Sequence, residues 1–294
     1  MYINSNSMAT QVSNNLTSHY SDLKTSTERL SSGLRINSAA DDAAGLAIRE
    51  LMRTDIAALQ QGVRNANDAI SLIQTADGAL GIIDEKLTRM KELAEQAATG
   101  TYDSTQRLMI ESEYQAMASE ITRIANATDF NGIHLLDGNL SSDTHDGSGM
   151  SSTGKLKVHF GTANDSAEDY YYIKIGTSTA SALGVGNQAV GTDGLTVSTQ
   201  EAAQKALVAI TNAVVSKDKI RAHLGALQNR LENTISNLTT QSENLQAAES
   251  RISDVDVATE MTKFVRNQIL TQSSVAMLSQ ANSMPRMAMT LISG

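Results

Sequence analysis

Apolar residues recur at seven-residue intervals in two segments that lie far apart along the chain. The first segment carries two series, one of Ile56, Val63 and Ile70 and one of Leu59, Ala66, Ile73, Leu80 and Leu87. The second segment carries Leu224, Leu231, Leu238, Leu245 and Ile252. Such repeats are typical of the a and d positions of a coiled coil, whose apolar stripe has to be buried against another helix. We therefore predict a mainly α fold, a helical bundle or coiled coil in which two long helices pack antiparallel.

Capping signals predict where these helices begin and end. Asp41 and Asp42 precede a segment, residues 43–99, that would form one helix of about 85 Å at the usual rise. A helix cap explains this acidic pair better than a catalytic pair of carboxylates does. Asp103 and Gln106 have capping-box spacing and predict a third helix that stops before Asp129. A second such box, from Ser198 to Glu201, opens the returning helix.

The middle of the chain interrupts the helical pattern. Residues 137–155 are rich in Gly, Ser, Asp and Thr, which is typical of a loop. Leu156, Val158 and Phe160 then alternate with polar residues, and so do Tyr171, Ile173 and Ile175. This alternation predicts a β-hairpin.

The two chain ends carry apolar residues that one helix cannot bury alone. Residues 1–35 have a thin stripe that includes Leu16, Leu23 and Leu30 among many polar residues. Residues 257–294 have an apolar set that includes Phe264, Val265, Ile269 and Leu278. Isolated short helices are marginal in water, so each end needs a partner. We expect these seven residues to serve self-assembly, in which the ends fold as they pair with each other and with neighbouring copies.

Composition narrows the possible partners and explains the length of the helices. Pro285 is the single proline, so the rest of the chain lacks the residue that breaks helices, which favours long uninterrupted helices. The net charge of -9 argues against nucleic acid and against an anionic membrane surface, both of which require basic faces. Cysteine is absent, which excludes disulfides and thiolate metal sites. The first residues lack the basic and apolar regions of a secretory signal peptide.

The sequence offers no convincing catalytic, cofactor or metal site. The segment from Gly149 to Lys155 matches most of a phosphate-binding loop, but Leu156 stands where a hydroxyl residue is required, so a glycine loop is the simpler interpretation. The five histidines are scattered and form no zinc motif. We expect a protein that is not an enzyme.

One long stretch carries a family resemblance. Residues 30–48 read LSSGLRINSAADDAAGLAI, which resembles the N-terminal signature of bacterial flagellins nearly residue for residue. The similarity also covers the segments from Met1 to Leu80 and from about Leu224 to the C-terminus, roughly three quarters of the chain. A signature of this length is far more specific than a short motif.

The resemblance implies a domain organisation. Residues 1–40 with 257–294 would form a terminal helical core domain, and residues 41–256 would form a rod domain with its β-hairpin region at about 133–197. The short distance between Gly132 and Ser198 implies that the large outer domains of some flagellins are absent.

The resemblance also implies a function and partners. The chain would be a secreted structural subunit that polymerises with identical copies into the extracellular filament of the bacterial flagellum and so serves motility. Type III export without a cleaved signal peptide is implied, with an export chaperone on the C-terminal segment and with cap and hook-filament junction proteins as partners. Recognition by Toll-like receptor 5 of hosts is implied by the residues that match the family's contact pattern, namely Arg89, Leu93 and Glu113.

Two alternatives and one departure stay open. A hook-filament junction protein or a related flagellar axial protein shares the terminal helices, although the signature at residues 30–48 favours flagellin. A flagellin with a metalloprotease insert would need a His-Glu-x-x-His motif in the central region, which the sequence lacks. The C-terminus departs from the family pattern at Ser283-Met284-Pro285-Arg286, which bears on the chemistry of a filament lumen.

Overall fold

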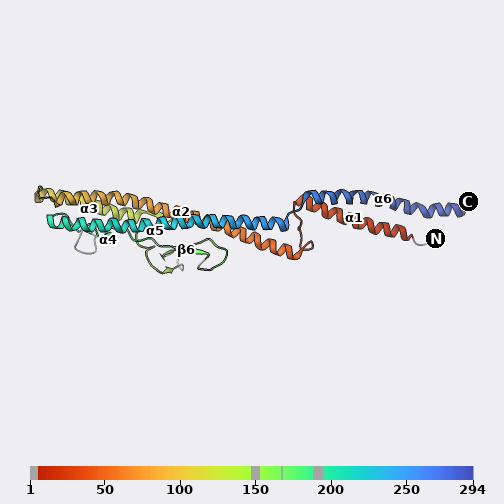
Figure 1. The fold of residues 1–294 in the computed structure, drawn as a ribbon, viewed down its shortest axis with the longest axis horizontal. Coiled ribbons are helices and arrows are strands. Elements are labelled where there is room, and N and C mark those ends of the chain that lie inside the picture. The colour runs from red at the N-terminus through yellow and green to blue at the C-terminus, as the bar shows by residue number, and fades with distance from the viewer. Residues whose placement is uncertain (1–5, 147–152, 167, 188–194, 294) are drawn as a thin grey trace. The chain divides into compact units, whose positions relative to one another are not determined.

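The computed structural model describes residues 6–146, 153–166, 168–187 and 195–293, and there it has the predicted mainly α fold (Figure 1). Its helices are α1 (Ser7–Ser32), α2 (Ala43–Ala98), α3 (Ser104–Ala127), α4 (Ala180–Leu183), α5 (Gln200–Ser253) and α6 (Val257–Ser293). Its strands are β1 (Asp129–Phe130), β2 (Ile133–His134), β3 (His145–Asp146), β4 (Thr153–Gly154), β5 (Leu156–His159) and β6 (Tyr170–Ile173). In these residues no helix is long and apolar enough to cross a membrane.

The chain divides into two compact units. The first consists of Met1–Ile56 with Glu243–Gly294, and the second of Ala57–Ser242. The first unit thus holds α1 and α6 together with the start of α2 and the end of α5. The domain boundaries implied by the family resemblance, at residues 40 and 257, stay a prediction.

The capping predictions are confirmed at α3 and need correction at two other helices. At α3, Asp103 and Gln106 form the predicted reciprocal capping box, and the helix ends before Asp129. At α5 the hydroxyl of Thr199, one residue after Ser198, accepts the hydrogen bond from the Ala202 amide at 3.2 Å. The cap predicted at Ser198 is therefore wrong, because Thr199 caps α5, and Ala202 cannot complete a reciprocal box with it.

The acidic pair before α2 has divided roles. Asp42 caps the helix as predicted, because its carboxylate accepts from the amide of Gly45 at 2.8 Å. Asp41 instead holds the preceding turn, where it accepts from the amides of Asn37 and Ser38. The hydrogen bonds from Ser38 are the main reason that the pKa of Asp41 is lowered. A cap thus explains only one of the two carboxylates.

Most members of the predicted heptad series face the interior of the second unit, whereas Ile56, Leu245 and Ile252 belong to the first unit and are half-buried. The α2 series from Leu59 to Leu87 is at most 4% exposed, whereas Ile56, Val63 and Ile70 are half-buried. On α5, Leu224, Leu231 and Leu238 are buried. The periodicity therefore identified the buried stripe of each long helix.

Ion pairs show how α2 and α5 lie side by side. Lys217 of α5 is 1% exposed, and its ammonium lies 2.6 Å from the carboxylate of Asp84 on α2. Arg221 of α5 pairs with Asp77 of α2 at 2.7 Å. Residues 77 and 84 increase along α2 while their partners decrease along α5, so these helices are antiparallel, as predicted.

The predicted β-hairpin is present as β5 and β6, which pair antiparallel from Leu156 opposite Ile173 to His159 opposite Tyr170. Shorter hairpins pair β1 with β2 and β3 with β4. Gly62 of α2 lets the end of β5 approach, since a Cβ at this position would lie 2.0 Å from the carbonyl oxygen of Phe160. The β5–β6 hairpin is thus docked on the helices. The segment 137–155, predicted to be a loop, contains the short strands β3 and β4, and its residues 147–152 lie outside the described residues.

Candidate assembly surface

The helices α1 and α6 form an antiparallel pair in the first unit (Figure 1). The side-chain amide of Asn6 donates to the carbonyl of Ala281 at 2.8 Å, and the hydroxyl of Ser26 donates to Glu260 at 2.7 Å. From one contact to the other, the residue number rises along α1 by nearly as much as it falls along α6. The two helices therefore keep one antiparallel register between these contacts.

The facing positions of this pair, here called the seam, follow alternating spacings of four and three residues. On α1 the less exposed positions are Val12, Leu16, His19, Leu23, Ser26 and Leu30. On α6 they are Glu260, Phe264, Asn267, Thr271, Ser274, Leu278 and Ala281. This spacing is that of a coiled coil. About half of the seam is polar, so pairing α1 with α6 buries little apolar surface.

A buried carboxylate sits near one end of the seam. Glu260 is 3% exposed and accepts from Ser26 and, at 3.1 Å, from the ammonium of Lys263. Burial by itself acts to raise the pKa of Glu260, but the hydrogen bonds from Ser26 and Lys263, with the charges of Lys263 and Arg29, bring the net pKa below its ordinary value. The carboxylate is thus held in its ionised form within the seam.

Backbone hydrogen bonds join the chain segments next to the seam, residues 33–35 and 252–255, which we call the clasp. The amide of Arg35 donates to the carbonyl of Ser253 at 2.6 Å, and the amide of Val255 donates to the carbonyl of Gly33 at 3.0 Å. Gly33 ends α1 in the left-handed region at φ 73°, which glycine adopts without strain. The clasp fixes the level at which α6 starts relative to the end of α1.

The large apolar side chains of α6 lie mostly outside the seam. Val257, Met261, Val265 and Ile269 follow one another every four residues along one ridge and are 44–57% exposed. Leu270, Val275 and Met277 are exposed as well. A helix with apolar residues around its circumference is stable only when it is surrounded. The pair as a whole therefore presents apolar surface that other helices can cover.

The seven residues predicted to serve assembly divide between these two surfaces. Leu16, Leu23, Leu30, Phe264 and Leu278 lie in the seam, half-buried. Val265 and Ile269 lie on the exposed ridge. Sequence reasoning missed Ser26, Glu260 and Thr271, because it followed only apolar residues. The alternating spacing along α6 could have identified them.

The three residues matched to a receptor contact lie on α2 and α3. Arg89 pairs with Glu113 at 2.9 Å and with Glu92 at 2.9 Å, and all three side chains are exposed. The hydrogen bonds to Glu92 and Glu113 raise the pKa of Arg89 above its ordinary value. Leu93 is only 1% exposed. The structure thus brings Arg89 and Glu113 together on the surface and places Leu93 in the core beneath α2.

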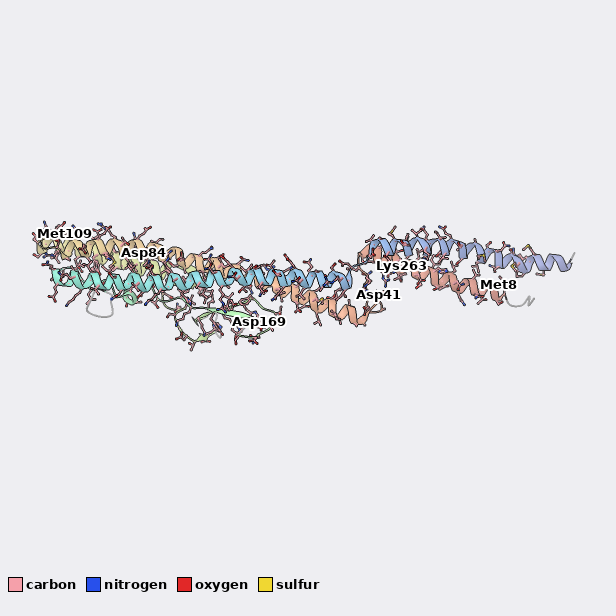
Figure 2. All side chains as sticks on the ribbon, viewed as in Figure 1. Met8, Asp41, Asp84, Met109, Asp169 and Lys263 are labelled. Carbon is pink, nitrogen blue, oxygen red and sulfur yellow. The ribbon has the colours of Figure 1, made fainter. Side chains whose placement is uncertain are left out.

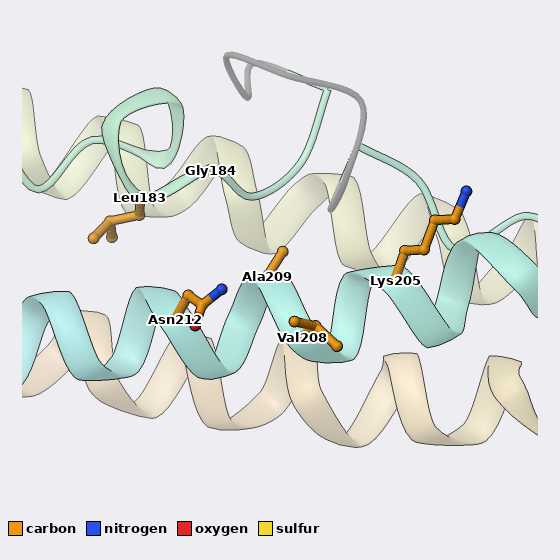
Figure 3. Close-up of a pocket in the computed structure, with 6 residues that line it drawn as sticks. All are labelled: Leu183, Gly184, Lys205, Val208, Ala209 and Asn212. Atoms are coloured by element: carbon orange, nitrogen blue, oxygen red, sulfur yellow. The ribbon is translucent and has the colours of Figure 1, made fainter.

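A shallow pocket beside α4 and α5 has little chemistry to offer (Figure 3). Its lining consists of Leu183, Gly184, Lys205, Val208, Ala209 and Asn212. One lysine and one amide provide no pair of nucleophile and base. Across the described part of the chain, no group of three or more His, Cys, Asp and Glu side chains could hold a metal ion.

Sequence comparisons match the helical segments at both ends of the chain to known flagellar proteins. A sequence model of the bacterial flagellin N-terminal helical region matches residues 3–141, and one of the C-terminal helical region matches residues 207–292. The chain is 41% identical to the flagellar filament 33 kDa core protein of Treponema phagedenis, over 99% of this chain and 100% of that protein. It is 42% identical to a flagellin of Bacillus subtilis over 99% and 100% of the two chains.

A solved structure described as a flagellar hook-associated protein of Vibrio parahaemolyticus has the same fold. It aligns with 73% of this chain and 100% of its own, with a TM-score of 0.55 and 15% sequence identity. At 15% sequence identity, this structural similarity shows a shared fold and nothing about function.

Proposed function

Because this chain belongs to the family of bacterial flagellins, we propose that it polymerises through α1 and α6, whose exposed apolar residues become buried against the same helices of neighbouring copies. Members of this family are structural, non-enzymatic subunits of the flagellar filament, which lies outside the cell. The observation that carries the proposal is the ridge from Val257 to Ile269, together with a seam too polar to stabilise the pair by itself. Copies packed around α6 would cover this ridge, so folding of the ends and assembly proceed together.

Seeded growth tests this proposal. Monomers obtained by acid or heat dissociation are mixed with short filament seeds and followed by electron microscopy. The intact chain grows, whereas a chain without residues 1–35 and 257–294 does not. The double variant Val265→Ser and Ile269→Ser, which changes only exposed side chains, slows growth at least tenfold. Val208→Ser with Val215→Ser, two exposed valines of α5, is the matched control. Normal growth of the ridge variant would show that assembly does not use this ridge.

The same ridge supports a proposal about export. An exposed apolar segment aggregates unless it is covered, which gives a cytoplasmic chaperone a reason to hold α6. Cap and junction proteins would then take over at the filament tip and base. Type III export without a cleaved signal peptide predicts filament subunits whose N-terminal peptide, identified by mass spectrometry, starts at Met1 or Tyr2. A start further into the chain would contradict uncleaved export.

Recognition by Toll-like receptor 5 is a separate proposal that rests on Arg89 and Glu113. Their adjacent exposed charges offer a polar contact, while Leu93 acts from the core by holding α2 in place. Arg89→Ala in the monomer should reduce receptor signalling at least tenfold. Arg123→Ala removes another exposed arginine from an ion pair, the one with Glu120, and should leave signalling unchanged. Equal signalling by both variants would rule out a role for Arg89.

A further inference from the structure

Exposed methionines gather on the two terminal helices. Met1 and Met150 lie outside the described residues, and six of the other ten methionines are exposed. One of the six, Met109, belongs to α3, and the other five belong to α1 and α6. These five, here called the thioether set, are 44–59% exposed: Met8 of α1 and Met261, Met277, Met287 and Met289 of α6. Exposed sulfur is thus concentrated on the helices that present the apolar surface.

We propose that the thioether set is a site of reversible oxidation, where peroxides convert the thioethers to sulfoxides and thereby prevent the subunit from assembling. Such a site rests on the proposed function, because it acts on the surface by which copies polymerise. It acts on the subunit before assembly, while these side chains are in contact with water.

The composition leaves peroxides few other targets. Cysteine and tryptophan are absent, so every sulfur atom of the chain belongs to a methionine thioether. Thiolates are the most reactive sulfur groups of most proteins, and their absence directs two-electron oxidants to methionine. The reagent also has to reach the sulfur atom, so exposed thioethers react first. Met90, which is 0% exposed, is the protected counterpart of the thioether set.

Most of the thioether set lies towards one end of the α1–α6 pair. The side-chain amide of Asn6 donates to the carbonyl of Ala281, so Met8, two residues further along α1, lies within one turn of the level of Met277. Figure 2 shows Met8 at the end of the pair away from Lys263. The last two members follow on α6, so four of the five gather towards this end.

The fifth member lies on the exposed ridge of α6. Met261 stands between Val257 and Val265 in the four-residue spacing of that ridge and is 44% exposed. An oxidisable sulfur atom therefore lies within the surface that neighbouring copies are proposed to cover.

Oxidation converts part of this surface from apolar to polar. A thioether packs readily against the irregular apolar surface of a partner. A sulfoxide carries an oxygen atom that water hydrates in the monomer and that apolar neighbours leave without a hydrogen bond. Each sulfoxide therefore opposes assembly, whereas the folded monomer, in which the thioether set is exposed, is little affected.

The reaction needs only the peroxide and is reversible. The sulfur atom takes one oxygen atom from hydrogen peroxide and gives up two electrons, while the O–O bond breaks and the second oxygen leaves as water. Methionine sulfoxide reductases reverse the change with two electrons from a dithiol, and one enzyme acts on each epimer. The sulfoxide oxygen then leaves as water as well.

Adaptable packing is another reason for methionine on an assembly surface. Leucine distinguishes the two roles, because it keeps an apolar side chain of similar size but cannot be oxidised. Leucine throughout the thioether set should therefore preserve assembly and abolish only the response to peroxide.

Peroxide treatment of monomers tests the site. Monomers are treated with hydrogen peroxide, the peroxide is removed, and oxidation of each methionine is measured by peptide mass spectrometry. The thioether set should be oxidised first and Met90 last. After seeding, the concentration of monomer left in equilibrium with filaments should be raised about tenfold or more, because the costs of several buried polar groups add. Reductases A and B with dithiothreitol should return it to within about twofold of its starting value.

Leucine variants separate the thioether set from the other methionines. In the chain with leucine at all five positions, peroxide should change the residual monomer concentration less than about twofold. The matched control carries Met90→Leu, Met109→Leu and Met117→Leu, which leave the thioether set intact, and should respond as the wild type does. Each variant is compared with its own untreated state, so a change in assembly caused by leucine itself is subtracted.

Three results would overturn the inference. Monomers with sulfoxide throughout the thioether set assemble like untreated ones, or the reductases fail to restore assembly, or peroxide still inactivates the five-leucine variant. If that variant does not assemble at all, recovery of the oxidised wild-type chain with the reductases decides. Growth of the untreated wild-type chain is measured alongside, so failure of the oxidation site is distinct from failure of the filament function.

Discussion

The hydroxyl of Ser26 on α1 donates a hydrogen bond of 2.7 Å to the carboxylate of Glu260 on α6, and both residues are at most 3% exposed. They are 234 residues apart in the chain. The contact joins the two ends of the sequence through a polar pair inside a seam where leucine would be expected. Buried polar groups of this kind make a helix pair sensitive to protonation.

Acid should weaken the pairing of α1 with α6 through Glu260. The pKa of this group is lowered from 4.5 in the folded chain. Its contribution to stability is therefore complete above about pH 4.5 and is lost as the pH falls through the folded pKa. Glu260→Gln should remove that part of the pH dependence, measured as the assembled fraction between pH 6 and 3. Glu28→Gln, at an exposed position of α1, is the control and should follow the wild type.

Alanine at Gly62 should detach the β5–β6 hairpin from α2. The added Cβ would lie 2.0 Å from the carbonyl oxygen of Phe160, so the backbone has to move. We expect a loss of about 1–3 kcal/mol in the free energy of unfolding, as for other overpacked sites. Gly78 of α2 has no atom within 4 Å of an added Cβ. Gly78→Ala should instead stabilise the chain by about 0.5–1 kcal/mol, and denaturant unfolding separates the two outcomes.

Changes at the buried ion pair of Lys217 should act in opposite directions. Asp84→Asn removes one of the two carboxylates that pair with this ammonium, the other being Asp218 at 2.7 Å, and should destabilise the second unit by about 1–3 kcal/mol. Lys217→Met fills the same space without a charge, and the carboxylates it leaves, Asp84 and Asp218, are 40% and 60% exposed to water, so stability should stay unchanged or rise. The measurement is thermal unfolding of monomers at equal concentration. A large loss in the methionine variant would mean that the ammonium stabilises the fold beyond its packing.

The ion pair of Arg89 with Glu113 should contribute little to stability. Both side chains are exposed by more than 40%, and exposed pairs are worth at most about 1 kcal/mol. A double-mutant cycle with Arg89→Ala and Glu113→Ala should give a coupling free energy in that range. A much larger coupling would mean that lost receptor signalling in Arg89→Ala reflects unfolding.

Sequence periodicity predicted the long helices well because their buried stripes are apolar and regular. The series from Leu59 to Leu87 was enough to identify the buried face of α2. The box at Asp103 placed the start of α3, since both of its reciprocal hydrogen bonds are local. The cap prediction failed where two residues suited to capping are adjacent, as with Ser198 and Thr199. Local sequence cannot choose between neighbours whose geometry depends on the packing of the whole helix.

The seam was harder to predict than the long helices. Its polar members, such as Ser26 and Thr271, are residue types that usually face water, and only the pairing of distant helices shows that they are buried. Leu93 could not be placed from the sequence either. The family resemblance grouped it with Arg89 and Glu113, but the packing of three helices decides that Leu93 is buried while the other two stay exposed.

Because about half of the seam is polar, α1 and α6 are weakly paired in a single chain. A seam made only of leucines would hold α1 and α6 together in a single chain, whereas a seam in which about half of the positions are polar opens at a smaller cost. If copies assemble through α1 and α6 as proposed, the order of these two helices follows mass action and rises with the number of neighbours present. On the proposed assembly, the concentration of subunits, as much as the sequence, sets how far α1 and α6 are ordered.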